Sequence, residues 1–406
     1  VIVGSGMVGS SLACALAKSQ LVSSIVVIDR LPFPKQPTSD IPDPRVVTLT
    51  PASQHFMSSI DSWDLIDQIR RPEFSEMKVW DDFGTGFMHF EQARGWVVEN
   101  SAIVHANMKR LQDFSNVEIL NETAIKRIIP GTSAVTIELE DDKVIKTQLI
   151  VGAEGKDSSV RQAFGIGTWN WSYPHNGLTC VVKVHSNNRQ AHQRFLKSGP
   201  IALLPLWDNY VSVVWSLTPD LTERMQSISE TQFIEELNRA ISLPSSTQFP
   251  FNDPYSSIQP VTAESLATKR FVFPYTMQHA RSYVAPRVAL IGDSAHTLHP
   301  MAGQGFNLGL YDSINLASEL CKSAELGRDL GDLEALERFQ FKSRSYNLTL
   351  TAMEQALLVL YGDYWPLNYV RNFGMSAISY LAPLKSLIVT GANGSIFVPS
   401  DLPWNR

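Results

Sequence analysis

The chain has 406 residues, of which 44% are hydrophobic, so it can bury one large core or two of moderate size. Its formal net charge is −6 and it has no long run of Lys or Arg, which argues against nucleic acid as a partner. No uncharged apolar run reaches the roughly 18 residues that a membrane-spanning helix needs. These properties predict a protein that is soluble or peripherally attached to a membrane.

The cysteines and the start of the chain carry information about its setting. Cys14, Cys180 and Cys321 are odd in number and far apart, so we expect reduced, buried thiols in an intracellular protein. Val1 already lies within the first predicted strand. We therefore expect the sequence to be a fragment, with any targeting peptide in the part that is not given.

The first residues predict a dinucleotide-binding loop. A short β-branched run at 1–3 precedes a GxGxxG pattern, and a helix-forming run follows at 10–19. The glycines are Gly4, Gly6 and Gly9. In such loops the first glycine allows a tight turn, the second lets backbone approach a pyrophosphate, and the third lets helix and strand pack closely. The helix N-terminus offers its free N–H groups to the phosphates. The alternative is a purely structural turn.

The next predicted strand supports the nucleotide interpretation. Residues 25–28 are apolar and end in Asp29, about 20 residues beyond the last glycine, which is the offset of a ribose-binding acid. Arg30 would suit the extra phosphate of NADP, but Asp29 would repel that phosphate. Arg30 is otherwise a solvated surface charge.

A second glycine-rich segment lies almost 300 residues further along. The buried-type strand at 287–291 ends in Gly292 and Asp293, and Asp293 is placed to hold a polyol hydroxyl. The run at 300–305 has few bulky side chains, so its backbone can approach a flat ligand. A helix dipole aimed at a flavin would stabilise negative charge on the reduced ring. The pair of segments predicts FAD held from both ends of the chain.

Two other interpretations of the distal segment exist. Asp293, His296 and His299 are spaced by three residues and could be imagined as metal ligands, although they would spread around a helix axis. The segment could also be a loop with two incidental histidines. We predict flavin binding and no metal.

Together with a third segment at 152–161, which begins Gly-Ala-Glu-Gly, these motifs resemble the group A flavin-dependent aromatic hydroxylases. In that family the first motif binds the ADP of FAD, and the distal Gly-Asp motif binds the ribityl chain and pyrophosphate. The middle motif lies near the cofactor and has a proposed part in binding a reduced nicotinamide donor.

Within that family the chain is most similar to the ubiquinone-biosynthesis hydroxylases. The similarity is carried by residues 199–206, 213–215 and 286–293, and residues 77–81 and 97–100 resemble the eukaryotic, mitochondrial members. It extends from the start of the chain to about residue 387.

Two positions depart from the family pattern. Glu154 replaces the usual Asp of the middle motif, and His175 stands where bacterial relatives tend to have Gln. The first change puts contacts to a nicotinamide donor in doubt. The resemblance implies electrons from a ferredoxin and its reductase, or from NADPH, and a membrane-associated coenzyme Q biosynthetic complex at the matrix face of the mitochondrial inner membrane.

The resemblance implies an α/β fold with a Rossmann-like FAD-binding domain, an α+β substrate domain built on an antiparallel sheet, as in para-hydroxybenzoate hydroxylase, and a helical C-terminal region. We expect the FAD domain at 1–73, 95–173 and 275–324, the substrate domain at 74–94 and 174–274, the helical region at 325–390 and a tail at 391–406. The stretch at 242–260 is rich in Ser and Pro and predicts a surface loop. The apolar run at 357–388 is either a helical cap on the FAD domain or an apolar surface for the inner membrane or a partner.

The resemblance also implies the site residues. The residues that we expect to hold FAD are Gly4, Gly6, Val8, Gly9, Asp29, Arg30, Arg45, Glu154, Gly155, Gly292, Asp293, Pro300, Gly303, Gln304, Gly305, Phe306 and Asn307. Arg45, Pro300 and Gly303 form the expected catalytic set because they would face the flavin or the active-site mouth, with no side-chain nucleophile required. For Arg45 the alternative is a surface salt bridge.

Three further residues are left with open roles. His175 either contacts the substrate or is a histidine at a sheet edge whose hydrogen bonds are made within the protein. Asp312 caps or pairs within its helix, and Arg161 makes a structural ion pair or a cofactor contact.

The implied activity is hydroxylation of a polyprenyl-hydroxybenzoate or polyprenylphenol ring, at position five, with O2 as the oxygen source by way of a flavin hydroperoxide. One alternative is a flavin hydroxylase of a small soluble aromatic acid. The other is a FAD-stabilised scaffold subunit of a biosynthetic complex.

Overall fold

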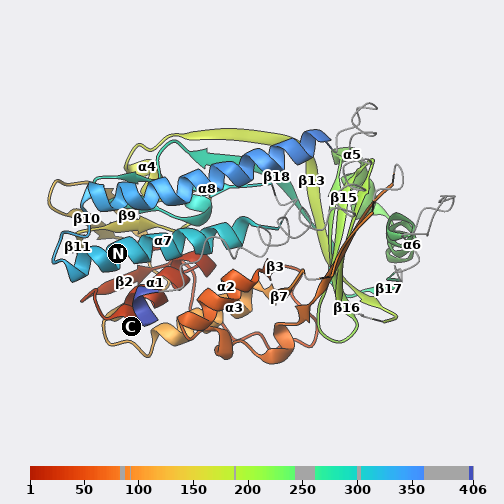
Figure 1. Ribbon diagram of the computed structural model, residues 1–406, viewed down its shortest axis with the longest axis horizontal. Helices are drawn as coiled ribbons and strands as arrows, with labels where there is room; N and C mark the ends of the chain where they lie inside the picture. The colour runs from red at the N-terminus through yellow and green to blue at the C-terminus, as the bar shows by residue number, and fades with distance from the viewer. Residues whose placement is uncertain are drawn as a thin grey trace.

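The computed structural model describes residues 1–82, 87–91, 93–186, 189–242, 261–299, 303–360 and 402–405, without the side chains of 357–360. Two bodies lie side by side along the long axis (Figure 1). One is a mainly parallel sheet covered by helices, and the other is a large, mainly antiparallel sheet. This is the combination of sheets that the sequence predicted.

The parallel sheet has the strand order β8-β2-β1-β12-β20, with β19 antiparallel at its edge. Its strands are β1 (Ile2–Val3), β2 (Ile25–Ile28), β8 (Val117–Leu120), β12 (Ile150–Gly152), β20 (Val288–Leu290) and β19 (Val284–Ala285). The chain builds first to one side of β1 and then to the other. Such a sheet binds ligands at the carboxyl ends of its strands, where the order reverses. Here that point lies between β1 and β12.

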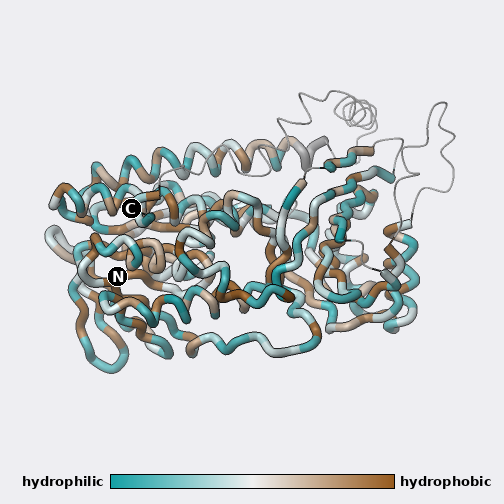
Figure 2. The backbone as a smooth tube through the Cα atoms, turned by 60° about the horizontal axis from the view of Figure 1, so that its bottom comes forward, coloured by the Kyte–Doolittle hydropathy of each residue, from teal (hydrophilic) through white to brown (hydrophobic). Residues whose placement is uncertain are grey.

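Four helices cover this sheet: α1 (Met7–Ser19), α3 (Asn100–Leu111), α7 (Gly305–Glu325) and α8 (Leu333–Leu360). The central strands are Ile- and Val-rich and buried, as expected for parallel strands packed on both faces. A Cβ atom on Gly9 would lie 2.0 Å from the Gly4 carbonyl oxygen, so only glycine lets α1 start so close to β1. Along α8 the backbone alternates between hydrophilic and hydrophobic residues (Figure 2), as in a helix with one buried side.

Two three-stranded antiparallel sheets complete this body. One contains β9 (Ile125–Ile129), β10 (Val135–Leu139) and β11 (Val144–Thr147), and the other contains β3 (Val46–Leu49), β7 (Gly95–Glu99) and β4 (Glu73–Phe74). The short helices nearby are α2 (Pro51–Ser59), η1 (Trp63–Leu65), η2 (Gln68–Arg70), α4 (Ser159–Ala163) and η3 (Gly292–Ser294).

The large sheet has the order β21-β18-β13-β16-β15-β14-β5-β6, and β17 also pairs with β13. Its strands are β5 (Glu76–Asp81), β6 (Phe87–Phe90), β13 (Thr168–Val184), β14 (Gln190–Leu196), β15 (Gly199–Pro205), β16 (Tyr210–Leu217), β17 (Ala263–Leu266), β18 (Phe271–Ala280) and β21 (His296–Thr297). Its pairs are antiparallel except β14 with β5. Helices α5 (Pro219–Ser227) and α6 (Glu230–Ile241) pack against one face and bury a second apolar core. The other face is left for the cavity described below.

The end of the chain returns to the first body. In η5 (Pro403–Asn405) the Trp404 side chain is buried, stacks edge-on against Phe56 and donates a hydrogen bond to Ser59 Oγ at 3.0 Å. Most of the predicted surface loop at 242–260, and the apolar run and tail up to residue 401 beyond α8, lie outside the described residues.

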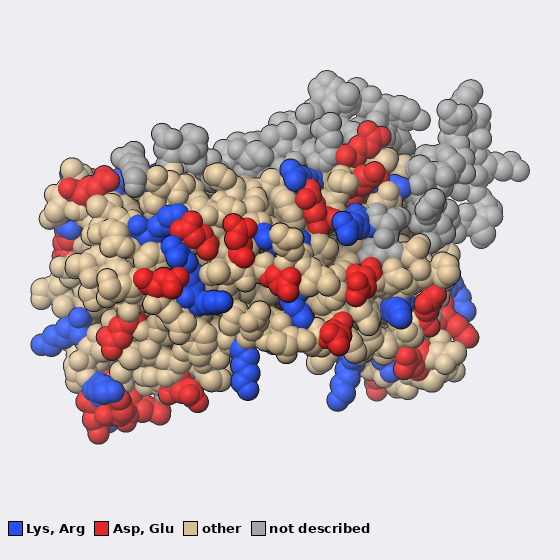
Figure 3. All heavy atoms as spheres, turned by 90° about the horizontal axis from the view of Figure 1, so that it is seen from below, with Lys and Arg blue, Asp and Glu red and all other residues tan. Residues whose placement is uncertain are grey.

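The cysteines are buried and unpaired, as predicted. Burial raises the pKa of both Cys14 and Cys180 to about 12, so these thiols are unreactive at neutral pH. On the face drawn in Figure 3, acidic and basic side chains are interspersed rather than gathered by sign.

Candidate functional site

A cavity of about 1650 Å³ opens at the carboxyl ends of the parallel strands and extends to the large sheet. It exceeds the roughly 300–1,000 Å³ of a site for one small molecule. Segments far apart in the sequence line it: 3–8, 28–31, 43–50, 153–157 and 303–306. The switch in strand order explains why the segments that follow β1 and β12 meet here.

The first glycine loop forms one end of the cavity. Gly4 has a φ of +102°, and a Cβ atom there would lie 2.4 Å from the Ala153 carbonyl oxygen, so the position requires glycine. A Cβ atom on Gly6 would meet nothing within 4 Å, which leaves open space in front of α1. No side chain caps the N-terminus of α1, so its amides are available to a phosphate. Val8 also lines the cavity, whereas Gly9 serves the packing of α1.

Asp29 is held in a fixed orientation at the end of β2. Its carboxylate accepts hydrogen bonds from Ser5 N at 2.6 Å, from Ser5 Oγ at 2.8 Å and from Leu31 N at 2.9 Å. A carboxylate has about four lone-pair sites, so one remains for a ribose hydroxyl. Arg30 is exposed and lines the cavity beside it.

The middle motif is tied to neighbouring elements. The Glu154 carboxylate accepts hydrogen bonds from Ser158 Oγ, Ser159 Oγ and two backbone amides at the start of α4, so it anchors that helix. Gly155, at φ +87°, lines the cavity. The buried Arg161 donates to Ser294 O at 2.9 Å and to the Lys156 carbonyl, which joins the middle and distal motifs. Among the described residues Arg161 forms no ion pair and does not line the cavity; it makes structural hydrogen bonds to carbonyl groups instead.

The distal motif packs against the first loop at Val8 and also lines the cavity. Gly292 has a φ of +56°, and among the described residues no hydrogen-bond donor reaches the Asp293 carboxylate. Asp293 is exposed and lines the cavity, and desolvation by the surrounding protein raises its pKa. The carboxylate is therefore available to a ligand hydroxyl.

The start of α7 provides a second open helix end. Gly303 has a φ of +60°, and a Cβ atom on Gly303 or Gly305 would meet nothing within 4 Å. Gln304 and Phe306 also line the cavity, and no side chain caps α7. The Asn307 side chain instead bonds to Thr48 O and Ser53 Oγ, so any ligand contact there must use backbone. Pro300 lies outside the described residues.

Arg45 lies at the cavity rim. Its side chain is 75% exposed and forms a salt bridge of 3.0 Å with Asp43, which raises the pKa of Arg45. Arg45 therefore lies at the cavity and also forms a surface ion pair, so both of its expected roles are compatible with the structure.

The histidines of the distal segment point to different partners. His296 bonds to Asp312 at 2.6 Å, and His299 packs between the rings of Tyr173 and Tyr275. Asp312 therefore pairs outside its own helix. Among the described residues, no group of three or more His, Cys, Asp or Glu side chains is arranged to hold a metal ion.

Sequence reasoning did not single out His299 as a cavity residue. Burial, with a smaller contribution from His175, lowers its pKa to about 4, so it is neutral at pH 7. His175 itself is half-buried and does not line the cavity. The position of His299 beside the expected flavin-facing Pro300 was the available signal.

The large sheet closes the cavity with a row of side chains that, apart from one glutamine, are small or apolar. The row crosses five strands in register and consists of Gln193, Ala202, Val214, Thr179 and Phe271. Alternation predicts that such residues share a face, but it does not tell which face meets the cavity.

Comparisons with known proteins agree with this geometry. The model of the FAD binding domain family matches residues 1–329. Ubiquinone biosynthesis monooxygenase COQ6, mitochondrial, of Homo sapiens is 34% identical over 429 residues, which cover 97% of this chain and 92% of that protein. Ubiquinone hydroxylase UbiL of Rhodospirillum rubrum is 33% identical over 413 residues, covering 99% and 91%.

Solved structures share the fold. The p-nitrophenol 4-monooxygenase PnpA of Pseudomonas putida superposes with a TM-score of 0.73 at 18% identity, covering 96% of each chain. PqsL, a probable FAD-dependent monooxygenase from Pseudomonas aeruginosa, gives 0.73 at 20% identity over 93% of this chain and 98% of that one. The predicted fold class is thereby confirmed. The cofactor is FAD, and the chain belongs to the FAD-binding monooxygenases of ubiquinone biosynthesis.

Proposed function

We propose that this FAD-dependent monooxygenase hydroxylates the ring of a polyprenylated phenol or hydroxybenzoate during ubiquinone biosynthesis, at ring position five. The observation that carries the proposal is the continuity of one cavity, from two open helix N-termini to the apolar face of the large sheet. The names of the human and bacterial relatives support the pathway. We also propose the domain limits and cofactor-binding residues expected from the sequence.

The residues present fit FAD. Gly6 and the start of α1 would hold the pyrophosphate, Asp29 a ribose and Asp293 a hydroxyl of the ribityl chain, while Gly303 and Gly305 leave room for the ring. Bound FAD supplies the activation of O2. The protein orients the substrate ring and excludes water from it.

The substrate end of the cavity suits an apolar phenol. The row from Gln193 to Phe271 offers mostly carbon to a ring or tail. His299 is neutral at pH 7, so it holds a proton on only one ring nitrogen. Phenol oxidation at an ortho carbon is favoured when the hydroxyl proton is partly transferred to a neighbouring group.

We place the enzyme at the matrix face of the mitochondrial inner membrane, as a peripheral member of a coenzyme Q biosynthetic complex. The mitochondrial relatives support this location, whereas the bacterial one supports the reaction alone. Among the described helices, none is both long and apolar enough to cross a bilayer. The proposed electron donor is a ferredoxin with its reductase, with NADPH as the alternative.

The test is anaerobic reduction of the purified FAD-loaded protein, followed by admission of O2 with a substrate. Reduction by the ferredoxin system and formation of a hydroxylated prenylphenol are expected. Reduction by NADPH alone with product only from a soluble benzoate would replace the proposal by a conventional aromatic hydroxylase. Full flavin occupancy with no product from either substrate would favour a scaffold.

A further inference from the structure

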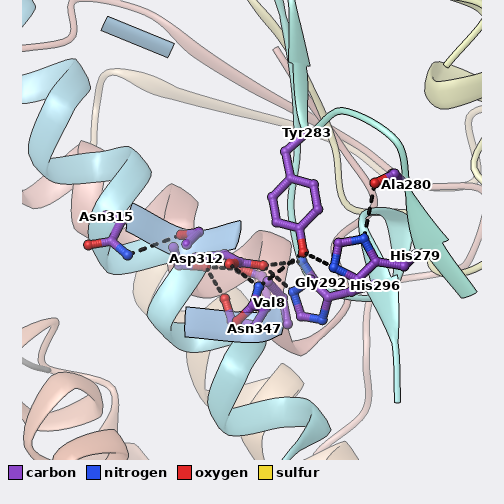
Figure 4. A network of polar contacts seen from close by, with 12 residues as sticks. Val8, His279, Ala280, Tyr283, Gly292, His296, Asp312, Asn315 and Asn347 are labelled. Carbon is purple, nitrogen blue, oxygen red and sulfur yellow. Dashed lines mark hydrogen bonds and ion pairs between the residues drawn. The ribbon is translucent and has the colours of Figure 1, made fainter. Parts of the chain in front are cut away.

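One face of α7 contacts both glycine loops. Gly309, Asp312 and Ser313 lie three and four residues apart, so they share one side of the helix. They contact Val8 of the first loop and Gly292 of the distal motif. Figure 4 shows Asp312 beside Gly292. We call these three residues the α7 clamp.

The clamp holds the first loop by close packing and one hydrogen bond. A Cβ atom on Gly309 would lie 2.5 Å from Val8 Cγ2, and one on Gly292 would lie 3.2 Å from the same atom. Ser313 Oγ lies 3.2 Å from Val8 O and donates to it. The helix, the first loop and the distal loop therefore meet at Val8.

The clamp holds the distal loop through a buried carboxylate. Asp312 Oδ2 accepts from Gly292 N at 3.0 Å and from His296 Nε2 at 2.6 Å. Asp312 Oδ1 accepts from Asn347 Nδ2 at 3.1 Å. The Asp312 and His296 side chains are 0% and 1% exposed. Burial alone would lower the pKa of His296, but the Asp312 carboxylate more than offsets this and the pKa is raised.

Further contacts fix this pair. The Tyr283 ring stacks on His296 with centroids 5.7 Å apart, and its hydroxyl lies 3.0 Å from His279 Nε2. Asn347 Nδ2, from α8, donates to the same hydroxyl at 3.3 Å. Figure 4 shows these side chains converging from β18 (His279), the turn between β18 and β19 (Tyr283), β21 (His296) and α8 (Asn347). The distal motif and α8 thus bond to Asp312 directly, and Tyr283 contacts both of its side-chain partners, His296 and Asn347.

We propose that Asp312 and Ser313 are positioning residues that set the separation of the two loops and thereby the affinity for FAD. Neither residue touches the cavity. Asp312 holds the amide of Gly292, immediately before Asp293, and Ser313 holds the carbonyl of Val8. The inference rests on the proposal that these loops hold FAD.

The test measures FAD dissociation constants of deflavinated variants by flavin fluorescence, with thermal unfolding of each apoprotein. Asp312→Ala leaves the Gly292 amide without its acceptor, and we expect FAD binding to weaken by about tenfold or more. Asp312→Asn keeps a neutral acceptor oxygen and is expected to recover part of this loss. The order of affinity is then wild type, Asn, Ala.

Two matched controls lie on the same helix. Glu319 is a buried carboxylate that pairs with Arg338 and Lys342 away from both loops, so Glu319→Ala is expected to lower the unfolding temperature with FAD affinity unchanged. Ser313 and Ser318 both bond to the carbonyl four residues earlier, but only Ser313 also reaches a glycine loop. Ser313→Ala is expected to weaken FAD binding several-fold, and Ser318→Ala is not.

The outcomes separate the two proposals. Wild-type affinity in Asp312→Ala, or an equal loss of affinity in Glu319→Ala at an equal fall in unfolding temperature, would overturn the positioning role. A wild-type protein that takes up no FAD would instead overturn the site assignment itself.

Discussion

At the scale of single residues, the glycines of the first loop have different structural roles. Gly6 has open space beside its Cα and a φ of −58°, which any residue can adopt. Gly6→Val should therefore fold but fill the space proposed for the pyrophosphate, and it should purify with little or no flavin. The measurement is flavin absorbance per protein together with the unfolding temperature of the apoprotein. Full flavin occupancy would remove this loop from the site.

Gly9→Val is the matched comparison. Its side chain would overlap Gly4 O, at 2.0 Å, and the Ala153 side chain, at 2.9 Å. Overpacking of this kind costs about 1–3 kcal/mol or more, so this variant should lose stability even without FAD. Equal apoprotein stability in the two variants would contradict the division of roles.

The sequence predicted which residues lie at the site. It was less informative about the hydrogen bonds that their side chains form. The glycines and Asp293 were recognisable because backbone geometry and a polyol contact allow few residue types. Glu154 lies in the middle motif and Asn307 in the distal motif, yet their side chains bond to α4 and to the β3–α2 segment. Such partners come from distant parts of the chain, and a local pattern contains no information on them.

At the scale of elements, hydrophobic periodicity predicted where strands and helices lie, but it did not predict how long each strand is or how it pairs. The runs at 178–184 and 211–217 were predictable as strands, but the 17-residue length of β13 was not. Its first half carries exposed aromatic side chains such as Trp169 and Trp171, so burial does not mark it as a strand. These residues are in the strand because they pair with β18. Only the folded sheet determines where such a strand begins.

Helix α8 carries a buried acid that should make stability depend on pH. Glu354 is 5% exposed, and desolvation raises its pKa from 4.5 to about 8. Between these values the folded state keeps a proton that the unfolded chain has lost, so the free energy of unfolding falls as pH rises. The slope attributable to this one group is about 1.4 kcal/mol per pH unit.

Glu354→Gln should remove that slope. Urea unfolding of both proteins at pH 5.5, 6.5 and 7.5 measures it, and the variant should gain relative stability at each step upward. Parallel pH dependences for the two proteins would show that the folded protein does not keep a proton on Glu354 in this pH range.

At the scale of the whole molecule, the two bodies are joined by interleaved chain segments. Strands β5 and β6 of the large sheet lie in the sequence between β4 and β7 of the first body. A buried salt bridge of 2.7 Å between Arg70 and Glu99 lies at this junction, and the Arg70 guanidinium stacks over Trp207 from the β15–β16 turn at 4.9 Å. Glu99 also accepts from Asp43 N at 2.6 Å. The pair therefore connects the large sheet to the loop that carries Arg45.

Breaking this pair should affect both stability and the cavity rim. Glu99→Gln removes the charge opposite Arg70 and should lower the free energy of unfolding by about 3 kcal/mol, because a charge is then left buried without its partner.

Arg70→Met combined with Glu99→Leu should cost less than the sum of the two corresponding single changes, since no charge remains unpaired. Asp142→Asn, which breaks the exposed pair with Lys126, should cost about 0–1 kcal/mol and serves as the control. Urea unfolding of the wild type, Arg70→Met, Glu99→Leu and the double variant gives the coupling energy directly. Additive losses would mean that Arg70 and Glu99 act independently, and the junction would then owe its rigidity to apolar contacts such as those around Trp207.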